Sequence, residues 1–401
     1  GLARTIVSGG AWPWGTYHYA GAPAVSWRGF ADVIFAEALQ AGLISRAPQV
    51  RAITTAEYPT PALRPLNSQL DMRDTEARLG LSPPAGFIGS NFVRHLLASD
   101  AQVRVTTLDL LTYAADRRNL DDLPGADRHQ LVVGDIADAA RVATLMRDAH
   151  IDTVVHFAAE SHVDRSISGP GAFVHTNVTG TFTLLEAARA AWQGRADVRF
   201  HHISTDEVFG TLGPDDPPFT EATAYAPNSP YSASKAASDH LVRAWFHTYG
   251  LPVVTTNCSN NFGPRQHAEK FIPTVIRACH AQAPIPVYGD GSNIRDWLYV
   301  TDHCRGIDAV MRGGRLGECY NLGGGNERSN VEIVRLICAA FDRRCPQRTP
   351  HAALMRFVTD RPGHDWRYAI DASKVAEELG WQRARCFEAE LDATLDWYLG
   401  S

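Results

Sequence analysis

The chain has 401 residues, of which 45% are hydrophobic and 20% are charged, and its formal net charge is −6. This composition is typical of a globular protein with room for more than one domain, and a slightly acidic chain lacks the basic surface by which proteins bind nucleic acid. No apolar run approaches the roughly 20 residues of a membrane-spanning helix, and no charged-then-apolar signal pattern opens the sequence. We therefore expect a cytoplasmic protein with no nucleic-acid or membrane partner.

The seven cysteines follow no spacing that is typical of a disulfide framework or of paired metal ligands. We expect free thiols in a reducing compartment and no metal site. The sequence opens on Gly1 and not on Met, which indicates a fragment or a processed product.

The first eighty residues do not begin a dinucleotide-binding fold, and they repeat features found near the end of the chain. The segment 15–21 (GTYHYAG) parallels 317–323 (GECYNLG), and a serine and an amphipathic helix follow each of them. An Arg-Pro pair and a later Leu-Gly pair recur in both blocks. We interpret the two blocks as two copies of one substrate-lobe design.

From residue 82 onward the sequence predicts a nucleotide-binding fold. A turn made of Gly86, Phe87, Ile88 and Gly89 opens a helix whose apolar residues recur with helical periodicity. The free N–H groups at such a helix start can bind a pyrophosphate. The next predicted strand ends in Asp109, where an acid about twenty residues past the glycines holds the ribose hydroxyls and favours NAD over NADP. The alternative is an acid that only caps a turn.

Further buried strands are predicted at 131–135, 151–157, 198–203 and 253–257, with helices at 139–146 and 173–192. This alternation predicts an α/β fold with a doubly wound parallel sheet. Ligands bind such sheets at the carboxyl ends of the strands. The strand 198–203 leads directly into Ser204, Thr205, Asp206 and Glu207, so two carboxylates are expected at that edge.

Tyr231 and Lys235 lie one turn apart in a good helix-forming run, which puts both on one face of the helix. Free tyrosine has a pKa of about 10, so it can accept a proton at neutral pH only where a nearby positive charge favours the phenolate. Lys235 is such a charge, and an oxidised nicotinamide would be another. The pair therefore indicates a base.

Residues 83–399 resemble the extended short-chain dehydrogenase/reductases, and most closely the dTDP-glucose 4,6-dehydratases. The adjacent carboxylates at Asp206 and Glu207 distinguish the dehydratases from related sugar epimerases, because the epimerases need no acid and base for eliminating water. Seven motifs carry the resemblance: 85–90 (AGFIGS), 156–165 (HFAAESHVDR), 204–210 (STDEVFG), Tyr231 with Lys235, 260–261 (NN), 295–298 (RDWL) and 361–364 (RPGH).

The resemblance implies a Rossmann-like NAD-binding domain over 83–263, to which 296–316 return, and a smaller nucleotide-sugar lobe over 264–401. It also implies a homodimer that forms through the helices around 173–192 and 231–249. The product would be dTDP-4-dehydro-6-deoxyglucose, for the biosynthesis of rhamnose and other deoxysugars.

A second resemblance concerns residues 1–82, which look like a C-terminal fragment of a dTDP-4-dehydrorhamnose reductase. The segments 15–21, 26–27 (SW) and 57–61 (EYPTP), with the Arg-Pro pair at 64–65, carry it. The cofactor-binding half and the Tyr-Lys pair of such a reductase are missing from this part of the chain. We therefore expect an extra α/β fragment without reductase activity.

The dehydratase resemblance implies a role for each catalytic residue. Tyr231 would take the C4 hydroxyl proton during oxidation by NAD, while Lys235 lowers its pKa and binds the nicotinamide ribose. Oxidation comes first, because only a C4 ketone makes the C5 proton acidic. Glu207 would then remove that proton, protonated Asp206 would donate to the leaving C6 hydroxyl, and Thr205 would hold the C4 oxygen. The hydride returns to C6, which regenerates NAD.

Binding residues also follow from the resemblance. Those implied for NAD are Gly86, Phe87, Ile88, Gly89, Asp109, Asp135, Ile136, Ala158, Ala159, Tyr231 and Lys235. Those implied for the nucleotide sugar are Ser161, His162, Asn260, Glu269, Lys270, Pro286, Tyr288, Arg295, Asn330, Arg361 and His364.

The chain departs from the family pattern at the first strand. Where the family has a strand ending in Thr-Gly-Gly, this sequence reads Leu81-Ser82-Pro83-Pro84. Proline has no N–H and a fixed φ, whereas glycine permits close approach to a ligand. We expect weakened NAD binding, a lost or replaced central strand with exposed strand edges, and a fusion joint near 82–85.

Two alternatives to this function remain open. The first is a catalytically silent protein that binds the sugar nucleotide but not NAD. The second is a dehydratase for another nucleotide sugar, such as UDP-glucose.

Overall fold

The computed structural model describes residues 86–112, 117–360, 365–384 and 386–400. The chain divides into two compact units, 1–81 and 82–401, and the first lies outside the described residues. The predicted N-terminal fragment, Pro83, Pro84, Arg361 and His364 lie outside them as well.

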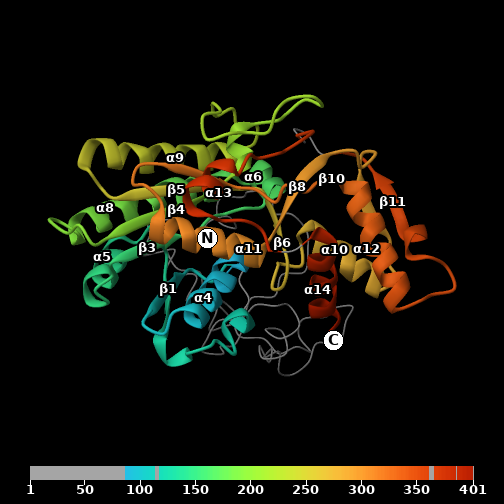
Figure 1. Cartoon of the computed structure of the whole chain (residues 1–401), viewed down its shortest axis with the longest axis horizontal. Coiled ribbons are helices and arrows are strands. Elements are labelled where there is room, and N and C mark those ends of the chain that lie inside the picture. Colours follow the sequence, from blue (N-terminus) through green and yellow to red (C-terminus); the bar gives the residue numbers. More distant parts are fainter. Residues whose placement is uncertain (1–85, 113–116, 361–364, 385, 401) are drawn as a thin grey trace, which may run out of the picture. The chain divides into compact units, whose positions relative to one another are not determined.

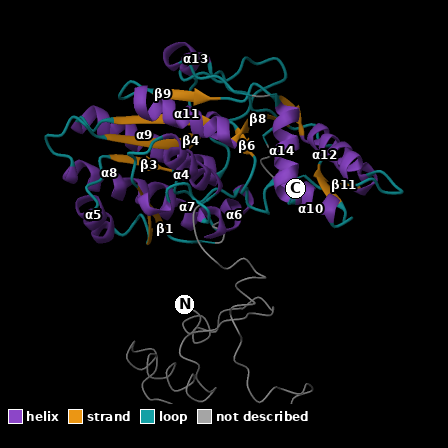
Figure 2. Cartoon of the chain, turned by 60° about the horizontal axis from the view of Figure 1, so that its bottom comes forward, coloured by secondary structure: helices purple, strands orange, loops and turns teal. Residues whose placement is uncertain are grey.

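A four-stranded parallel sheet forms the centre of the second unit, as the alternating pattern predicted. Its strands, in spatial order, are β3 (Thr153–His156), β4 (Arg199–Thr205), β5 (Val253–Cys258) and β9 (Cys319–Leu322). Nearly every residue of β4 and β5 is buried, as expected for strands that helices cover on both faces. Figure 2 shows these strands lying between helices. The prediction of a doubly wound α/β fold is confirmed.

Two groups of helices cover the two faces of this sheet (Figure 1). Neighbouring residues of β5 point to opposite faces, as the strand period of two requires: Val253 packs with one group and Val254 with the other. The first group is α5 (Ala139–Asp148), α8 (Thr181–Ala191) and α9 (Pro230–Tyr249). The second is α4 (Phe87–Ser99), α11 (Val300–Gly313) and α13 (Ser373–Leu379).

The sheet is interrupted next to β3. Strands β1 (Val105–Asp109) and β2 (His129–Val133) pair in parallel as a separate two-stranded sheet. Val105 of β1 and Val155 of β3 pack in the same apolar cluster under α4, yet no strand among the described residues joins β1 to β3. Side chains of β1 are only half-buried, unlike those of β4.

A smaller lobe contains most of the remaining elements. Its core includes Phe262, Ile272, Trp297, Ile337 and Phe387. The helices are α10 (Phe271–His280), α12 (Asn330–Arg344) and α14 (Phe387–Leu399). The strands are β7 (Ile285–Tyr288) paired with β11 (Met355–Val358), and β6 (Asn260–Phe262), β8 (Ile294–Tyr299) and β10 (Glu327–Ser329), with β8 in the middle.

The predicted single helix over 173–192 is wrong in detail. The chain there forms the end of α7 (Pro170–Phe173), then a π-helix η4 (Val174–Gly180), and only then α8. At Gly180 a Cβ atom would stand 2.4 Å from Ile136, so this glycine lets the segment pack closely against the chain after β2. Such π-helical insertions often occur at functional sites, and this one carries the buried Asn177.

Several short elements complete the second unit. They are α6 (Val163–Ser168) and the 3₁₀ helices η2 (Arg117–Leu120), η3 (Ala126–Arg128), η5 (Asp206–Phe209) and η6 (His351–Leu354). All seven cysteines have free thiols. Of the described helices, none is both long and apolar enough to span a bilayer.

Candidate active site

Strand β4 ends at Thr205, and the 3₁₀ helix η5 follows at once. Thr205 caps η5, because its Oγ1 accepts a hydrogen bond from the Glu207 N–H at 3.3 Å. Its carbonyl oxygen accepts another from Nδ2 of Asn257 on β5 at 3.0 Å. The short turn therefore fixes Thr205, Asp206 and Glu207 at the carboxyl edge of the sheet, as predicted for such a fold.

Asp206 is held in a state that favours a proton. Only 1% of the residue is exposed, and its Oδ2 atom has no hydrogen-bond partner among the described residues. Burial raises the pKa of this carboxyl well above its usual value, and the nearby carboxylates of Glu207 and Asp296 raise it further, against the opposing charge of Arg295. A carboxyl group that is neutral near pH 7 has the protonation state that a general acid needs.

Helix α9 carries the Tyr-Lys pair against this turn. Ser229 and Ser232 form a capping box at its start, which fixes where the helix begins. Tyr231 and Lys235 are both buried, and Lys235 Nζ donates a hydrogen bond to the Ile203 carbonyl oxygen at 2.8 Å. The hydrogen bond from Lys235 to Ile203 ties helix α9 to β4 beside the carboxylates.

The Tyr231 hydroxyl lies at the turn that follows β4, because it makes a hydrogen bond with Thr205 and the charge of Glu207 acts on it. Burial raises the pKa of this hydroxyl well above 10, and the negative charge of Glu207 raises it further, while the hydrogen bond with Thr205 opposes the shift. With the chain's own residues alone, the phenol keeps its proton at neutral pH. A positively charged ligand beside Tyr231 is needed to favour the phenolate.

The predicted NAD residues lie at the carboxyl ends of β1, β2 and β3. Gly86 caps α4, and among the described residues no atom other than those of its chain neighbours lies within 4 Å of the place a Cβ would take there, which leaves room for a ligand at the helix start. Asp109 ends β1, and its Oδ1 accepts from the Leu111 N–H at 2.8 Å. Phe87, Ile88 and Gly89 form the first turn of α4. These positions fit a dinucleotide lying across the strand ends.

Asp135 and Ile136 follow β2. Burial raises the pKa of Asp135, but hydrogen bonds from the Ala137 N–H and from His175 outweigh it, so the net pKa is lowered and the carboxylate stays charged. Ile136 is buried.

The segment after β3, with Ala158 and Ala159, is fixed by Asn177, which the sequence analysis missed. Asn177 Oδ1 accepts from the Glu160 N–H at 2.8 Å, and its Nδ2 donates to the Glu160 carbonyl at 3.0 Å and to Ser234 Oγ at 2.8 Å. This side chain therefore connects the predicted cofactor segment to helix α9. In the sequence, the only sign of this role is that Asn177 is a lone asparagine in a run expected to be helical.

Four predicted substrate residues come together between α6 and α10. Lys270 Nζ donates to the Ser161 carbonyl oxygen at 3.0 Å. Glu269 accepts two hydrogen bonds from Arg165, at 2.8 and 3.1 Å, and lies 3.8 Å from His162 Nε2. Residues more than a hundred positions apart thus form one charged cluster.

Arg295 lies near Asp206, a residue of the turn that follows β4. It is buried on β8, donates to the Asp365 carbonyl at 2.9 Å, and stacks on the Tyr368 ring with its guanidinium 4.4 Å from the ring centre. Its charge acts on Asp206. Asn260 on β6 has a buried Oδ1 without a partner in the described part of the chain, which leaves an acceptor for a ligand.

The other predicted substrate residues lie apart from this turn. Pro286 and Tyr288 share the exposed face of β7. Asn330 is the first residue of α12, and its N–H donates to the Asn293 carbonyl at 3.0 Å. Within the described residues, no hydrogen bond or ion pair links Pro286, Tyr288 or Asn330 to Tyr231 or to the turn after β4.

Comparison with known proteins agrees with this geometry. A family model described as GDP-mannose 4,6 dehydratase matches residues 84–394. A dTDP-glucose 4,6-dehydratase of Xanthomonas campestris is 57% identical over 322 residues, which cover 79% of this chain and 91% of that protein. The chain belongs to the dTDP-glucose 4,6-dehydratase family.

Solved structures of dTDP-glucose 4,6-dehydratases are similar as well. The enzyme of Streptomyces venezuelae, solved with NAD bound, gives a TM-score of 0.73 at 45% identity and covers 79% of this chain and 95% of its own. The enzyme of Bacillus anthracis, also in complex with NAD, gives 0.71 at 41% identity, with 79% and 94% covered.

A second family model, the RmlD substrate binding domain, matches residues 2–91, which overlap the start of the 84–394 match. Both resemblances stated from the sequence are thereby confirmed. The predicted boundaries between domains stay predictions.

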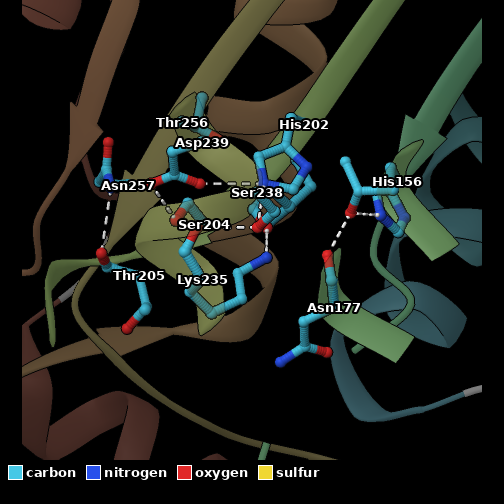
Figure 3. Close-up of polar contacts among 12 residues, drawn as sticks. His156, Asn177, His202, Ser204, Thr205, Lys235, Ser238, Asp239, Thr256 and Asn257 are labelled. Carbon is cyan, nitrogen blue, oxygen red and sulfur yellow. Dashed lines mark hydrogen bonds and ion pairs between the residues drawn. The ribbon is translucent and has the colours of Figure 1, made fainter. Parts of the chain in front are cut away.

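Beside Lys235 of this dTDP-glucose 4,6-dehydratase family member lies a buried polar cluster that the sequence analysis also missed (Figure 3). At its centre is Asp239, which contacts His202, Ser204 and Tyr225. Its spacing from Lys235, four residues along the same helix, was the available signal.

Proposed function

We propose that this protein is a dTDP-glucose 4,6-dehydratase that forms dTDP-4-dehydro-6-deoxyglucose, a precursor of rhamnose and other deoxysugars. The observation that carries the proposal is the gathering of buried Tyr231 and Asp206, with Glu207, around Thr205 at the end of β4, where each of the three makes a hydrogen bond with Thr205. A phenol beside two adjacent carboxylates supplies an oxidation base, an acid and a second base in one site. Membership of the family, with relatives of that activity at 57% identity, supports it.

The cofactor is NAD, which supplies a hydride acceptor at C4 and a hydride donor at C6 when bound. The open helix start at Gly86 and the acid Asp109 at the end of β1 support this choice. Neighbouring contacts come from Phe87, Ile88, Gly89, Asp135, Ile136, Ala158 and Ala159. Lys235 holds the ribose next to the nicotinamide.

The chain's residues then move the protons. Tyr231 accepts the proton of the C4 hydroxyl, which Thr205 holds by a hydrogen bond. Glu207 removes the C5 proton from the ketone. Asp206, neutral because it is buried, donates its proton to the C6 hydroxyl, which leaves as water.

The nucleotide diphosphate and the sugar bind to the remaining polar residues. Arg295 beside Asp206 and the acceptor of Asn260 support contacts near the sugar. The cluster of Ser161, His162, Glu269 and Lys270 supports a contact region between α6 and α10. The further residues proposed are Pro286, Tyr288, Asn330, Arg361 and His364.

The protein acts as a cytoplasmic homodimer through α8, α9 and η4. Apolar side chains are exposed on these three elements: Val174 is 54% exposed, Phe182 45% and Tyr249 52%. A shared apolar surface of neighbouring helices is typical of an interface. Sedimentation of wild type and Phe182→Glu tests it, with a dimer expected for the first and a monomer for the second.

Conversion of dTDP-glucose tests the activity. Purified protein with NAD should yield a product that is lighter by one water in mass spectrometry. Competition between dTDP-glucose and UDP-glucose at equal concentration decides the nucleotide, and we expect the dTDP sugar to react. Reaction of UDP-glucose alone would assign a dehydratase of another nucleotide sugar.

A second candidate is a catalytically silent protein that binds the sugar nucleotide without NAD. The interruption between β1 and β3 within the described residues favours it, because NAD lies across that part of a doubly wound sheet. Calorimetry with NAD separates the two. Tight binding by the native chain rejects the silent protein, whereas binding only after Pro83→Gly with Pro84→Gly supports it.

A further inference from the structure

Tyr231, Lys235 and Asp239 recur every four residues along α9, so they share one face of the helix. All three are buried, with at most 8% of any residue exposed. The proposed function gives roles to the first two only. A buried carboxylate on the same face, one turn beyond the lysine, requires its own explanation, because burying a charge is costly.

Asp239 accepts three hydrogen bonds, all from neutral donors. Figure 3 shows those from His202 and Ser204. His202 Nε2 lies 3.0 Å from Oδ1, and Ser204 Oγ and Tyr225 Oη donate to Oδ2 at 2.7 and 3.0 Å. Burial lowers the pKa of His202 to about 4, with Lys235 lowering it and Asp239 opposing, so the ring is neutral at pH 7. A neutral ring that donates from Nε2 leaves Nδ1 unprotonated.

The carboxylate itself stays charged. Burial raises the pKa of Asp239, but its hydrogen bonds with His202 and Ser204 and the positive charge of Lys235 outweigh burial, so the net pKa is below the usual value. None of the three donors neutralises the charge. Lys235 is therefore the cation that balances it.

Lys235, in turn, needs a nearby negative charge to stay protonated. Burial lowers the pKa of its ammonium group, and Asp239 is the strongest influence that raises it. Its ammonium donates a hydrogen bond to the carbonyl oxygen of Ile203, which solvates the ammonium without balancing its charge. A buried ammonium without a counter-charge tends to lose its proton.

The other titratable groups around this pair come from several elements. His202 on β4, Tyr225 before α9 and Cys319 on β9 face Asp239. His156 on β3 and Cys258 on β5 face Lys235. Burial lowers the pKa of His156 and raises those of Tyr225 and both thiols, so all are neutral near pH 7. Asp239 is the anion of this group.

We propose that Asp239 is a positioning residue: its carboxylate supplies the buried counter-charge that keeps Lys235 protonated and held against Ile203, in reach of the Tyr231 site. This inference rests on the proposed dehydratase function. It deepens that function by adding a charged third member to the Tyr-Lys pair.

The test compares Asp239→Asn with Tyr225→Phe in the full chain. Asparagine keeps the shape of the carboxyl, and the hydroxyls of Ser204 and Tyr225 can turn to accept from its amide, so the fold should tolerate it. The control removes one hydrogen bond to Asp239 and keeps the charge. The readout is the pH dependence of the first half-reaction, in which substrate reduces NAD.

For Asp239→Asn we expect the basic limb of the profile to move toward lower pH by about one unit or more, because the ammonium then titrates earlier. The rate at pH 8 should fall about tenfold with it, while Tyr225→Phe keeps the wild-type limb. An Asp239→Asn profile that is lowered equally at every pH, with an unmoved basic limb, would overturn the proposal.

A stability measurement tests the charge pair without any activity. Lys235→Met leaves Asp239 without its cation, so adding Asp239→Asn should raise the melting temperature above that of Lys235→Met alone. Strictly additive losses in the double variant would refute the coupling. The same measurement decides the matter if Asp239→Asn alone does not fold, or if the wild type proves inactive and the proposed function fails.

Discussion

The Nζ atom of Lys235 lies 2.8 Å from the carbonyl oxygen of Ile203, and this hydrogen bond joins helix α9 to strand β4. Ile203 comes two residues before Thr205, so the contact sets the distance between the Tyr231 helix and the carboxylate turn. This buried lysine therefore contributes to aligning the proposed base Tyr231 with the proposed acid Asp206.

Lys235→Met should lower the rate of NAD reduction by roughly 10²- to 10⁴-fold, the range by which positioned acid–base groups act. The reason is the loss of the buried ammonium that joins α9 to β4, one helical turn from Tyr231. Lys374→Met is a matched control, because Lys374 pairs with Glu318 on the surface side of β9, and we expect a change within about twofold. Single-turnover absorbance of NADH measures both, and equal rates for the two variants would contradict the role of Lys235.

Asn177→Ala should destabilise the fold by about 1–3 kcal/mol, since it removes the three hydrogen bonds that join this buried side chain to the Glu160 backbone and the Ser234 hydroxyl. Thr179→Ala, on an exposed neighbour in the same π-helix, should cost less than about 0.5 kcal/mol. Urea unfolding measures the difference. Equal midpoints for the two variants would show that Asn177 does not hold the segment after β3.

Acid should weaken the fold through its buried histidines. Burial lowers the pKa of His201 and His303 to about 3 and of His202 to about 4, whereas an unfolded histidine titrates near 6.5. The unfolded chain therefore binds protons below about pH 6.5 that the native protein refuses, so stability is full above this pH and falls below it. Each histidine contributes a loss of about 1.4 kcal/mol per pH unit.

Urea midpoints at pH 7.5 and 5.5 check this prediction. His303→Gln should reduce the pH slope by about one proton, whereas His247→Gln, at an exposed position of α9, should not. A wild-type midpoint that is the same at both pH values would contradict the prediction.

The sequence predicted those parts of the structure that depend on local pattern. Strand-helix alternation gave the sheet, and the four-residue spacing gave Tyr231 and Lys235 one buried helix face. The sheet is interrupted beside β3 within the described residues, and the predicted effect of Pro83 and Pro84 lies outside them.

Contacts between distant residues were not predictable in the same way. Asn177 reaches Ser234 across 57 positions, and Ser204 reaches Asp239 across 35, and each isolated polar residue resembles a surface position until its partner is known. The π-helix was missed for a similar reason, because Ile136 lies far from Gly180 in the sequence. Local periodicity carries no information about such packing.

In the proposed mechanism, a buried, protonated Asp206 and the Tyr231 base act on one sugar. The most direct measurement follows dTDP-glucose and NAD with Asp206→Asn by rapid quench, with Glu207→Gln in parallel. Because asparagine is also neutral, substrate binding and NAD reduction should survive, and NADH with a 4-keto glucose nucleotide should accumulate without loss of water. Release of the dehydrated product by Asp206→Asn at the wild-type rate would contradict this account.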